Sequence, residues 1–269
     1  MDNKKFKELI CVCGLFSVSA VFAAGIFSQD ASVSTFTWRR VENRAFTVGE
    51  RFQYTLRWGL MVVGYATIEV AGQEEVNGRM AYHIIARSNS YPFFDNIYKV
   101  RNIDESWMDV EGMCSLKYQK TQREGGYSRD ELIFFDHANR KFNMIERVKG
   151  KQPVSKTGDI PAFVQDIISA LYYVRLQQMD SRGEFFVDAH TGDKNYPLKV
   201  VVYGKERVKV PAGRYECFHV EPFVAQDTGI FRAKGRLWIW LTADSRRIPV
   251  LMKSKIFVGY ITAELVEKN

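Results

Sequence analysis

The chain has 269 residues, of which 46% are hydrophobic and 14% aromatic, and its formal net charge is +7. This composition is typical of a globular protein and excludes a disordered chain. The length fits one large β-domain or two small ones. The basic residues alternate along the predicted strands and form no long cluster, which argues against a nucleic-acid-binding protein.

The first residues have the pattern of an export signal. Lys4, Lys5 and Lys7 form a short basic start, and an apolar run over residues 9–25 follows it. Small residues around Ala23 suit cleavage, so we expect a signal peptide over residues 1–23. An uncleaved membrane anchor is the alternative, although the apolar run is short for a bilayer span. Both outcomes place the protein outside the cytoplasm, in the periplasm or attached to the envelope, and the pattern suits a bacterium.

A single β-rich domain is expected over residues 45–267. The preceding residues 24–44 are polar and lack a period, so we expect a flexible N-terminal spacer with Trp38 packed against the domain. Within the domain, apolar and polar residues alternate, which predicts strands with one buried face. Gly64 lies inside one such strand, where a missing side chain indicates a bulge or a close backbone approach. Asn77-Gly78 predicts a tight hairpin.

Turn residues separate the predicted strands at roughly the spacing of a β-sandwich or barrel. Residues 150–157 are expected to form a mobile basic loop. The predicted strands are Phe52–Trp58, Val62–Val70, Met80–Ser88, Ile97–Val100, Glu105–Val110, Leu116–Glu124, Tyr127–Phe135, Lys141–Val148, Glu184–Val187, Pro197–Tyr203, Glu206–Val210, Tyr215–Pro222, Lys234–Thr242, Arg247–Phe257 and Tyr260–Val266.

One long segment, Asp159–Met179, has a clear helical period. Asp159 can cap its start, and Pro161 suits the first turn because its missing N–H costs nothing there. A helix whose surface is apolar apart from one narrow polar stripe should be surrounded on several sides. We therefore predict a mainly β fold, a curved antiparallel sheet or open barrel wrapped around one long central helix. The stripe consists of Gln165, Asp166, Ser169 and Gln177.

Known catalytic signatures are missing from the sequence. It has no GxSxG, HExxH, P-loop or dinucleotide motif, so we predict no catalytic residue and no cofactor. The run 188–193 is the nearest approach to a metal or acid–base cluster, and an ordinary polar hairpin turn is the favoured interpretation. Cys114 and Cys217 could form a disulfide after export, but two isolated cysteines favour buried free thiols. No metal site is expected from either cysteine.

A polysaccharide hydrolase is the enzymatic alternative, because such an enzyme needs two carboxylates that meet only in space. Asp104-Glu105 and Asp130-Glu131 are each adjacent in sequence, so the two members of each pair point to opposite faces of a strand. Neither pair can act alone on one substrate. Three other acids are expected to pair with arginines such as Arg247 rather than to catalyse: Glu50, Glu206 and Glu264.

The aromatic residues are numerous for one domain, and plain core packing is the favoured explanation. The alternative is a cavity between helix and sheet that takes an acyl chain, or a groove that stacks on sugar rings. Alternation predicts that Trp238 and Trp240 share one face of their strand. Arg175, on the apolar side of the helix near its end, could meet a carboxylate or phosphate, extend into solvent, or stabilise the C-terminus of the helix. The candidate binding residues are Trp58, Tyr172, Arg175, Trp238 and Trp240.

Four stretches, in order, carry a resemblance to a known family. They are FTVGE at 46–50 with Trp58-Gly59, IISALYYVR at 167–175, VPAGRY at 210–215 and WLTADSRRIPV at 240–250. Together they resemble the bacterial "domain of unknown function 3108" family of exported proteins over residues 45–267. The resemblance implies an exported β-rich domain, and it implies no activity, cofactor or catalytic residue.

These features predict a non-enzymatic envelope protein that binds a hydrophobic or glycolipid ligand in carrier or assembly work. The alternatives are a structural or partner-binding module of an envelope complex, and the polysaccharide hydrolase. The basic charge makes lipid, lipopolysaccharide and acidic glycan the candidate ligands and a membrane surface a candidate partner, although charge can also serve solubility alone.

Overall fold

The structure is a computed structural model that describes residues 36–179, 182–224, 236–256 and 258–269. The expected signal peptide over residues 1–23 lies outside this part of the chain. So do residues 24–35 of the expected spacer and residues 234, 235 and 257 at the ends of two predicted strands.

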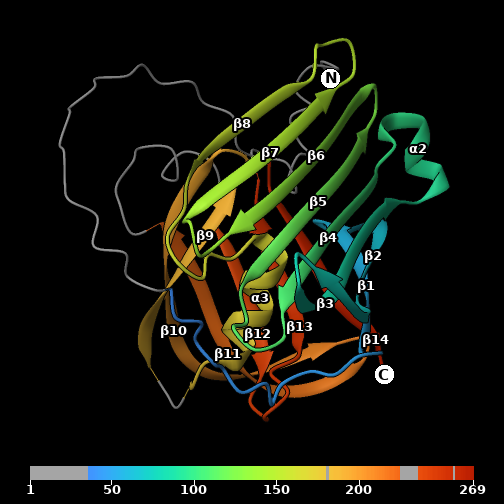
Figure 1. Cartoon of the computed structure of the whole chain (residues 1–269). Coiled ribbons are helices and arrows are strands. Elements are labelled where there is room, and N and C mark those ends of the chain that lie inside the picture. Colours follow the sequence, from blue (N-terminus) through green and yellow to red (C-terminus); the bar gives the residue numbers. More distant parts are fainter. Residues whose placement is uncertain (1–35, 180–181, 225–235, 257) are drawn as a thin grey trace.

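Fourteen strands form one antiparallel sheet in the order β8-β7-β6-β5-β4-β3-β2-β1-β14-β13-β12-β11-β10-β9. The sheet curls around a short helix, α3, and a second helix, α2, lies beyond the strand ends where it connects β3 to β4 (Figure 1). The elements are β1 (Arg51–Trp58), β2 (Met61–Val76), β3 (Arg79–Ser90), α2 (Pro92–Tyr98), β4 (Arg101–Asp109), β5 (Ser115–Glu124), β6 (Tyr127–Asp136), β7 (Lys141–Val148), β8 (Val154–Asp159), α3 (Ile167–Leu176), β9 (Gly183–Thr191), β10 (Lys194–Val210), β11 (Gly213–Val224), β12 (Leu237–Thr242), β13 (Pro249–Lys255) and β14 (Tyr260–Lys268).

The two edge strands, β8 and β9, do not pair, so the barrel stays open. The segment between β8 and α3 spans part of the gap, because Gln165 forms an isolated parallel bridge with Ala189 of β9. The Gln165 N–H donates to the Asp188 carbonyl at 2.8 Å, and the His190 N–H donates to the Gln165 carbonyl at 2.7 Å. The prediction of a curved antiparallel sheet around a helix is confirmed, and the sheet takes the form of an open barrel.

The predicted long helix over Asp159–Met179 is wrong. Helix α3 has ten residues, and Asp159 ends strand β8 instead of capping a helix. The backbone at Phe163 is left-handed, with a φ of 60°, and no continuous helix can pass through that conformation. Because Gln165 then pairs with β9, the helix can begin only after it.

Asp166 sets the start of α3. Its carboxylate accepts from the Ile168 and Ser169 N–H groups at 2.8 and 2.9 Å, and the Ser169 hydroxyl accepts from the Asp166 N–H at 2.9 Å. This reciprocal capping box satisfies N–H groups that the first helical turn leaves free. Asp166 and Ser169, which helical periodicity places in a polar stripe, therefore form the N-terminal cap of α3 inside the barrel.

The core surrounds α3 at one end of the barrel. Tyr172 packs against the Phe46 ring with centroids 4.8 Å apart, among buried residues of β1, β2, β4, β13 and β14. A second cluster joins Val174 to the inner faces of β9, β10, β11 and β12, and a third joins Val164 to β5, β6 and β7. Helix α3 is therefore enclosed by the sheet on several sides, as its apolar surface predicts.

Three smaller predictions also need correction. The predicted strand Ile97–Val100 overlaps the end of helix α2, which has proline in its first turn, and within the predicted strand Val100 forms a β-bridge with Glu124. The predicted loop over residues 150–157 overlaps the edge strand β8. The predicted strands Pro197–Tyr203 and Glu206–Val210 form one long strand, β10, which bends at a register shift next to Gly204.

The described part of the expected spacer packs against the domain. Arg39 donates to the carbonyls of Gly112 and Met113 at 2.7 and 3.0 Å. Trp38 stacks under the Arg79 guanidinium at 3.6 Å and contacts an apolar cluster that includes Trp107. The predicted position of Trp38 against the domain is confirmed.

At Gly64, the backbones of β2 and β3 approach each other closely. A Cβ atom at this position would lie 2.2 Å from the Asn89 carbonyl oxygen, a backbone atom that cannot swing away. Gly64→Ala should therefore lower the free energy of unfolding by about 1–3 kcal/mol. Gly72→Ala in the same strand is the matched control, since an added Cβ there meets nothing within 4 Å. Urea unfolding of both variants checks this, and equal stability of the two would contradict it.

Candidate functional site

The barrel interior has a filled end, around α3, and an opposite end that we call the mouth. The mouth is the end at which β1 meets β2, β3 meets β4 through α2, and β13 meets β14. Because side chains alternate along a strand, the inner face can be followed from the core residues toward the mouth. Two sides of this inner face differ in chemistry.

On one side, buried polar residues line the inner face of β4, β5 and β6. Tyr118 donates to the Asp104 carboxylate at 2.5 Å, and the Lys120 ammonium lies 3.6 Å from the same carboxylate. Nearer the mouth, the Asn102 amide donates to Glu124 at 2.6 Å. We call this set the polar wall: Asn102, Asp104, Lys120, Gln122, Glu124 and Glu131.

Burial changes the acidity of the polar wall. Burial raises the pKa of Glu131, and the neighbouring Arg129 and Lys120 oppose that rise. The pKa of the Tyr118 phenol lies well above its ordinary value, because the ring is buried and faces the negative charge of Asp104. Tyr118 therefore stays protonated and acts as a fixed donor.

Cross-strand pairing brings together one acid from each of the two acidic pairs, Asp104-Glu105 and Asp130-Glu131. Asp104 lies opposite Lys120, and Lys120 lies opposite Glu131, so two carboxylates flank one lysine. Their sequence neighbours, Glu105 and Asp130, are far more exposed, which confirms the predicted alternation. Glu131 also pairs with Arg129, so both carboxylates already have cationic partners. This arrangement is that of a charged network rather than of two acids positioned around a free water.

On the other side, apolar residues of β1, β2, β13 and β14 continue the inner face toward the mouth, and three of them, Leu56, Ala66 and Met252, still pack against the core. They are half-buried, unlike the residues of the same strands that pack against α3. Trp58 lies nearest the mouth, where its indole N–H donates to the Val258 carbonyl at 2.9 Å. We call this set the apolar wall: Leu56, Trp58, Ala66, Met252 and Ile261.

Tyr172 and Arg175 lie together, at the filled end rather than at the mouth. The Arg175 side chain is 0% exposed and forms a bidentate pair with Glu50 at 2.7 and 2.8 Å. Its guanidinium also donates to the carbonyls of Ala45 and Arg246, and it lies 4.8 Å from the centre of the Tyr172 ring. Arg175 thus meets a carboxylate, as one alternative predicted, but the carboxylate belongs to the protein itself.

Trp238 and Trp240 share one face of β12, as predicted, and that face points away from the interior. The intervening Ile239 and the following Leu241 are the buried members of the strand. Trp240 stacks on His219 with centroids 4.6 Å apart and donates to Glu206, whereas Trp238 lies under Arg236 at 4.7 Å. The five predicted binding residues therefore occupy three separate places.

Sequence reasoning missed the polar wall. Its signal was present as two strands in which polar residues recur at every second position, 102, 104 and 106 in one and 120, 122 and 124 in the other. Such a pattern normally marks a wet outer face. Only the strand order shows that this face is the inner one.

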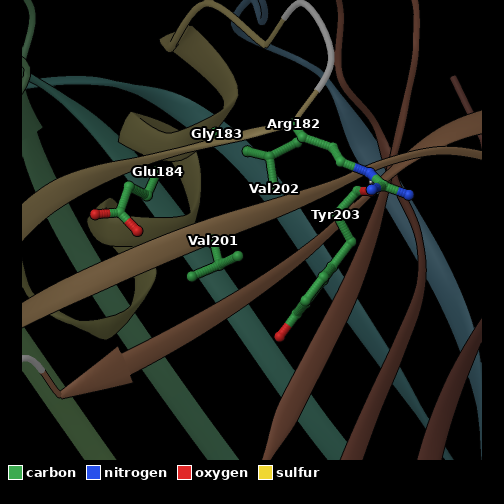
Figure 2. Close-up of a pocket in the computed structure, with 6 residues that line it drawn as sticks. All are labelled: Arg182, Gly183, Glu184, Val201, Val202 and Tyr203. Carbon is green, nitrogen blue, oxygen red and sulfur yellow. Dashed lines mark hydrogen bonds between the residues drawn. The ribbon is translucent and has the colours of Figure 1, made fainter.

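Two surface hollows lie away from the two walls. The larger, of about 630 Å³, lies on the outside of β9 and β10 and is lined by residues 182–184 and 201–203 (Figure 2). The other, of about 500 Å³, is lined by residues 43–50 with Arg246 and Asn269, beside the Glu50 ion pair. The Glu50 carboxylate in the second hollow is already paired with Arg175 and Arg246, and the first hollow is lined by residues of two strands on the outside of the sheet. We therefore place the candidate site on the inner face at the mouth.

The run 188–193 forms a hairpin turn, which confirms the favoured interpretation. His190 is buried and its ring is hydrogen-bonded to Asn195 at 2.8 Å and to the Gly192 carbonyl at 2.9 Å. In the described part of the chain, no three His, Cys, Asp or Glu residues are placed to hold a metal ion. Cys114 and Cys217 are both buried free thiols, and burial raises the pKa of each to about 12.

A family model described as "Protein of unknown function (DUF3108)" matches residues 53–266. The chain belongs to this family. The DUF3108 model spans both walls of the mouth and most of the core, apart from Ala45, Phe46 and Phe52, and it confirms the resemblance found in the sequence. No curated protein matches the chain in sequence.

Solved structures resemble the DUF3108 chain in fold. A beta-barrel-like protein of domain of unknown function DUF1849 from Brucella abortus is 9% identical, with a TM-score of 0.52 over 82% of this chain and 97% of that chain. A Bacteroides fragilis protein described as exported, with a YmcC-like fold, and a Parabacteroides distasonis protein described as a lipoprotein are 9% and 10% identical. Their TM-scores are 0.30 and 0.28, over 88% and 90% of this chain and 100% of each of theirs. At these identities the likeness to the first structure shows the barrel-like fold alone.

Proposed function

We propose that this protein is exported to the bacterial envelope and binds an amphiphilic ligand, a lipid or glycolipid, on the inner face at the mouth. The observation that carries the proposal is the division of this face into an apolar wall and a polar wall. An acyl chain would lie on Trp58 and Ile261, which are half-buried without a ligand, next to Leu56, Ala66 and Met252, which pack against the core. A polar headgroup would lie at the mouth end of the opposite wall, whose amides and charges are buried in the fold without a ligand.

The energetics favour a ligand with both characters. Covering half-buried apolar side chains yields about 25 cal/mol for each Å² removed from water, so an acyl chain gains free energy along the apolar wall. The polar wall contains both signs of charge, which suits hydroxyl-rich or zwitterionic headgroups better than a bare anion. Export is supported by the basic and apolar pattern of residues 1–23. No enzymatic step is needed for this role.

A partner-binding module is the second candidate, and the open barrel gives it one specific support. The outer edges of β8 and β9 carry backbone groups that no neighbouring strand of the described sheet pairs continuously. Such edges can accept a strand from another chain. The bridge at Gln165 and the ion pair between Lys156 and Asp193 at 2.6 Å occupy part of this gap, which makes the mouth the stronger candidate.

The ligand proposal is tested by native mass spectrometry of the protein purified from its own host. We expect a complex whose extra mass is released as a lipid or glycolipid on extraction. Ser88 lies on the inner face of β3, opposite Ala66 on one side and Asn102 on the other, so Ser88→Trp would fill the junction of the two walls. The bound fraction should fall by about tenfold or more in this variant.

Asn89→Trp is the matched control, because the neighbouring position points to the outer face and should leave binding intact. Ala66→Phe is a second obstructing variant, for which circular dichroism confirms that the fold is retained. A wild-type protein that carries no lipid, or equal binding by Ser88→Trp and Asn89→Trp, would overturn the ligand proposal.

A further inference from the structure

The mouth is edged by exposed apolar tips. Leu60 in the β1–β2 turn is 92% exposed, Phe93 in α2 is 73% exposed, and Ile97 in α2 and Val258 in the β13–β14 turn are 53% and 50% exposed. Burying such side chains elsewhere in the fold would have stabilised it, so their exposure on neighbouring connections indicates an interaction surface. We call residues 57–64, 91–101, 253–256 and 258–260 the rim.

The parts of the rim lie next to one another. Trp58 donates to the Val258 carbonyl at 2.9 Å, which joins the β1–β2 turn to the β13–β14 turn. The Tyr91 N–H donates to the Val63 carbonyl at 3.0 Å, and the Tyr65 and Tyr91 rings lie 5.7 Å apart, which joins the first residues of β2 to the start of α2. Apolar tips backed by Trp and Tyr are the side chains that favour the boundary between lipid headgroups and acyl chains.

The rim is also positively charged. It holds five cationic residues and a single acid, Asp95. Asp95 is already neutralised, since Arg101 donates to its carboxylate at 2.6 Å and Ser90 donates at 2.5 Å. Lys99 and Lys255 are exposed beside the tips, and Lys253 covers the Tyr260 ring at 4.3 Å. The remaining cations match an anionic lipid surface.

We infer that the rim docks on an anionic bilayer surface, with Leu60, Phe93 and Val258 in the headgroup–acyl boundary and Lys99 and Lys255 at the lipid phosphates. Docking in this orientation turns the mouth toward the membrane. No helix among the described residues is long and apolar enough to cross a bilayer. The contact we propose is a peripheral one, made by side chains of the rim. The inference extends the proposed function, but the experiment that tests it measures contact with the membrane and not ligand binding.

The test places a nitrobenzoxadiazole fluorophore at the rim of the full chain. Leu60→Cys is labelled in a background with Cys11→Ser and Cys13→Ser, and the buried Cys114 and Cys217 react poorly because their thiol pKa values lie at about 12. With phosphatidylcholine vesicles that contain phosphatidylglycerol, the emission should shift to the blue and be quenched by brominated lipid. The label reports its own surroundings, so the result does not depend on how residues 1–23 are processed.

The matched control is Phe186→Cys, which carries the label on the outer face of β9, a position 62% exposed and outside the rim. Its emission should stay unchanged. Replacing both Lys99 and Lys255 by glutamine should raise the lipid concentration for a half-maximal shift by about thirtyfold. An unshifted label at position 60, an equal shift at position 186, or an equal response to vesicles of phosphatidylcholine alone would overturn the inference. A shift at position 60 in a protein that carries no extractable lipid would support docking and reject the ligand proposal.

Discussion

Replacing Glu50 by glutamine should lower the free energy of unfolding by about 3–5 kcal/mol, the largest loss expected from one substitution in this chain. Arg175 would remain charged and fully buried, with carbonyl oxygens but no carboxylate beside it. Removing one partner of a buried ion pair costs the desolvation of the other charge, which cannot be recovered from solvent. Urea unfolding followed by circular dichroism measures the loss.

The partner variant and the double variant separate the ion pair from general packing. Arg175→Met should cost less, because Glu50 keeps a second cation in Arg246 at 3.2 Å, which is partly exposed. Glu50→Leu combined with Arg175→Met should be more stable than Glu50→Gln alone, since it leaves no buried charge. Glu267→Gln, at an exposed position of β14, is the control and should change stability by less than about 0.5 kcal/mol. A loss no larger than that control would show that Arg175 is not held by Glu50.

The strand pattern could be predicted from the sequence because one face of nearly every strand packs on the core. Alternation located β1, β7 and the start of β2 within one residue, although β2 continues six residues beyond its predicted end, and Asn77-Gly78 located the turn between β2 and β3. Asn77 and Gly78 both have positive φ, at 51° and 79°, as the predicted hairpin turn requires. These signals are local, so the sequence contains them in full.

The length of the helix could not be predicted in the same way. Residues 160–164 are apolar for a tertiary reason, because Ile160 and Val164 pack against β5, β6 and β7. The same apolar residues fit a helical period, which cannot distinguish a buried crossing segment from a buried helix. Only Asp166 and Ser169 gave the true start, and they make a capping box only if the chain before them is extended.

The candidate site depends on strand order, and the sequence does not contain strand order in readable form. Trp240 and Trp58 look alike in sequence, yet one lies on the outer face with His219 and the other at the mouth. Asp104 and Glu131 belong to strands separated by β5, and only the pairing of all three shows that they flank Lys120. Conversely, Arg175 was identified as anomalous from its apolar surroundings alone, because a lone arginine in a buried helix must find an anion.

Asp166→Ala should lower the free energy of unfolding by about 3 kcal/mol, the second large effect that we expect. The variant loses the helix cap, which is worth about 1 kcal/mol. It also leaves the buried hydroxyls of Ser106 and Ser115 without an acceptor, since both donate to the Asp166 carboxylate, at 2.6 and 2.5 Å. Each unsatisfied buried donor adds about 1–3 kcal/mol, partly relieved by rotation of the hydroxyl. Asp188→Ala, at an exposed position of β9, is the control.

The stability of the protein should also depend on pH through the Asp166 carboxyl, and this dependence provides a second test of the role of Asp166. Burial raises the pKa of this carboxyl above its ordinary value, although four hydrogen-bond donors oppose the rise. An acid whose pKa is raised on folding stabilises the fold below its unfolded pKa, and this contribution is lost as the pH rises through the folded pKa. The stability of the wild type relative to Asp166→Asn should therefore fall as the pH rises through the weakly acidic range. A difference between these two proteins that stays constant with pH would mean that the carboxyl does not titrate differently on folding, and the cap would then act through hydrogen bonding alone.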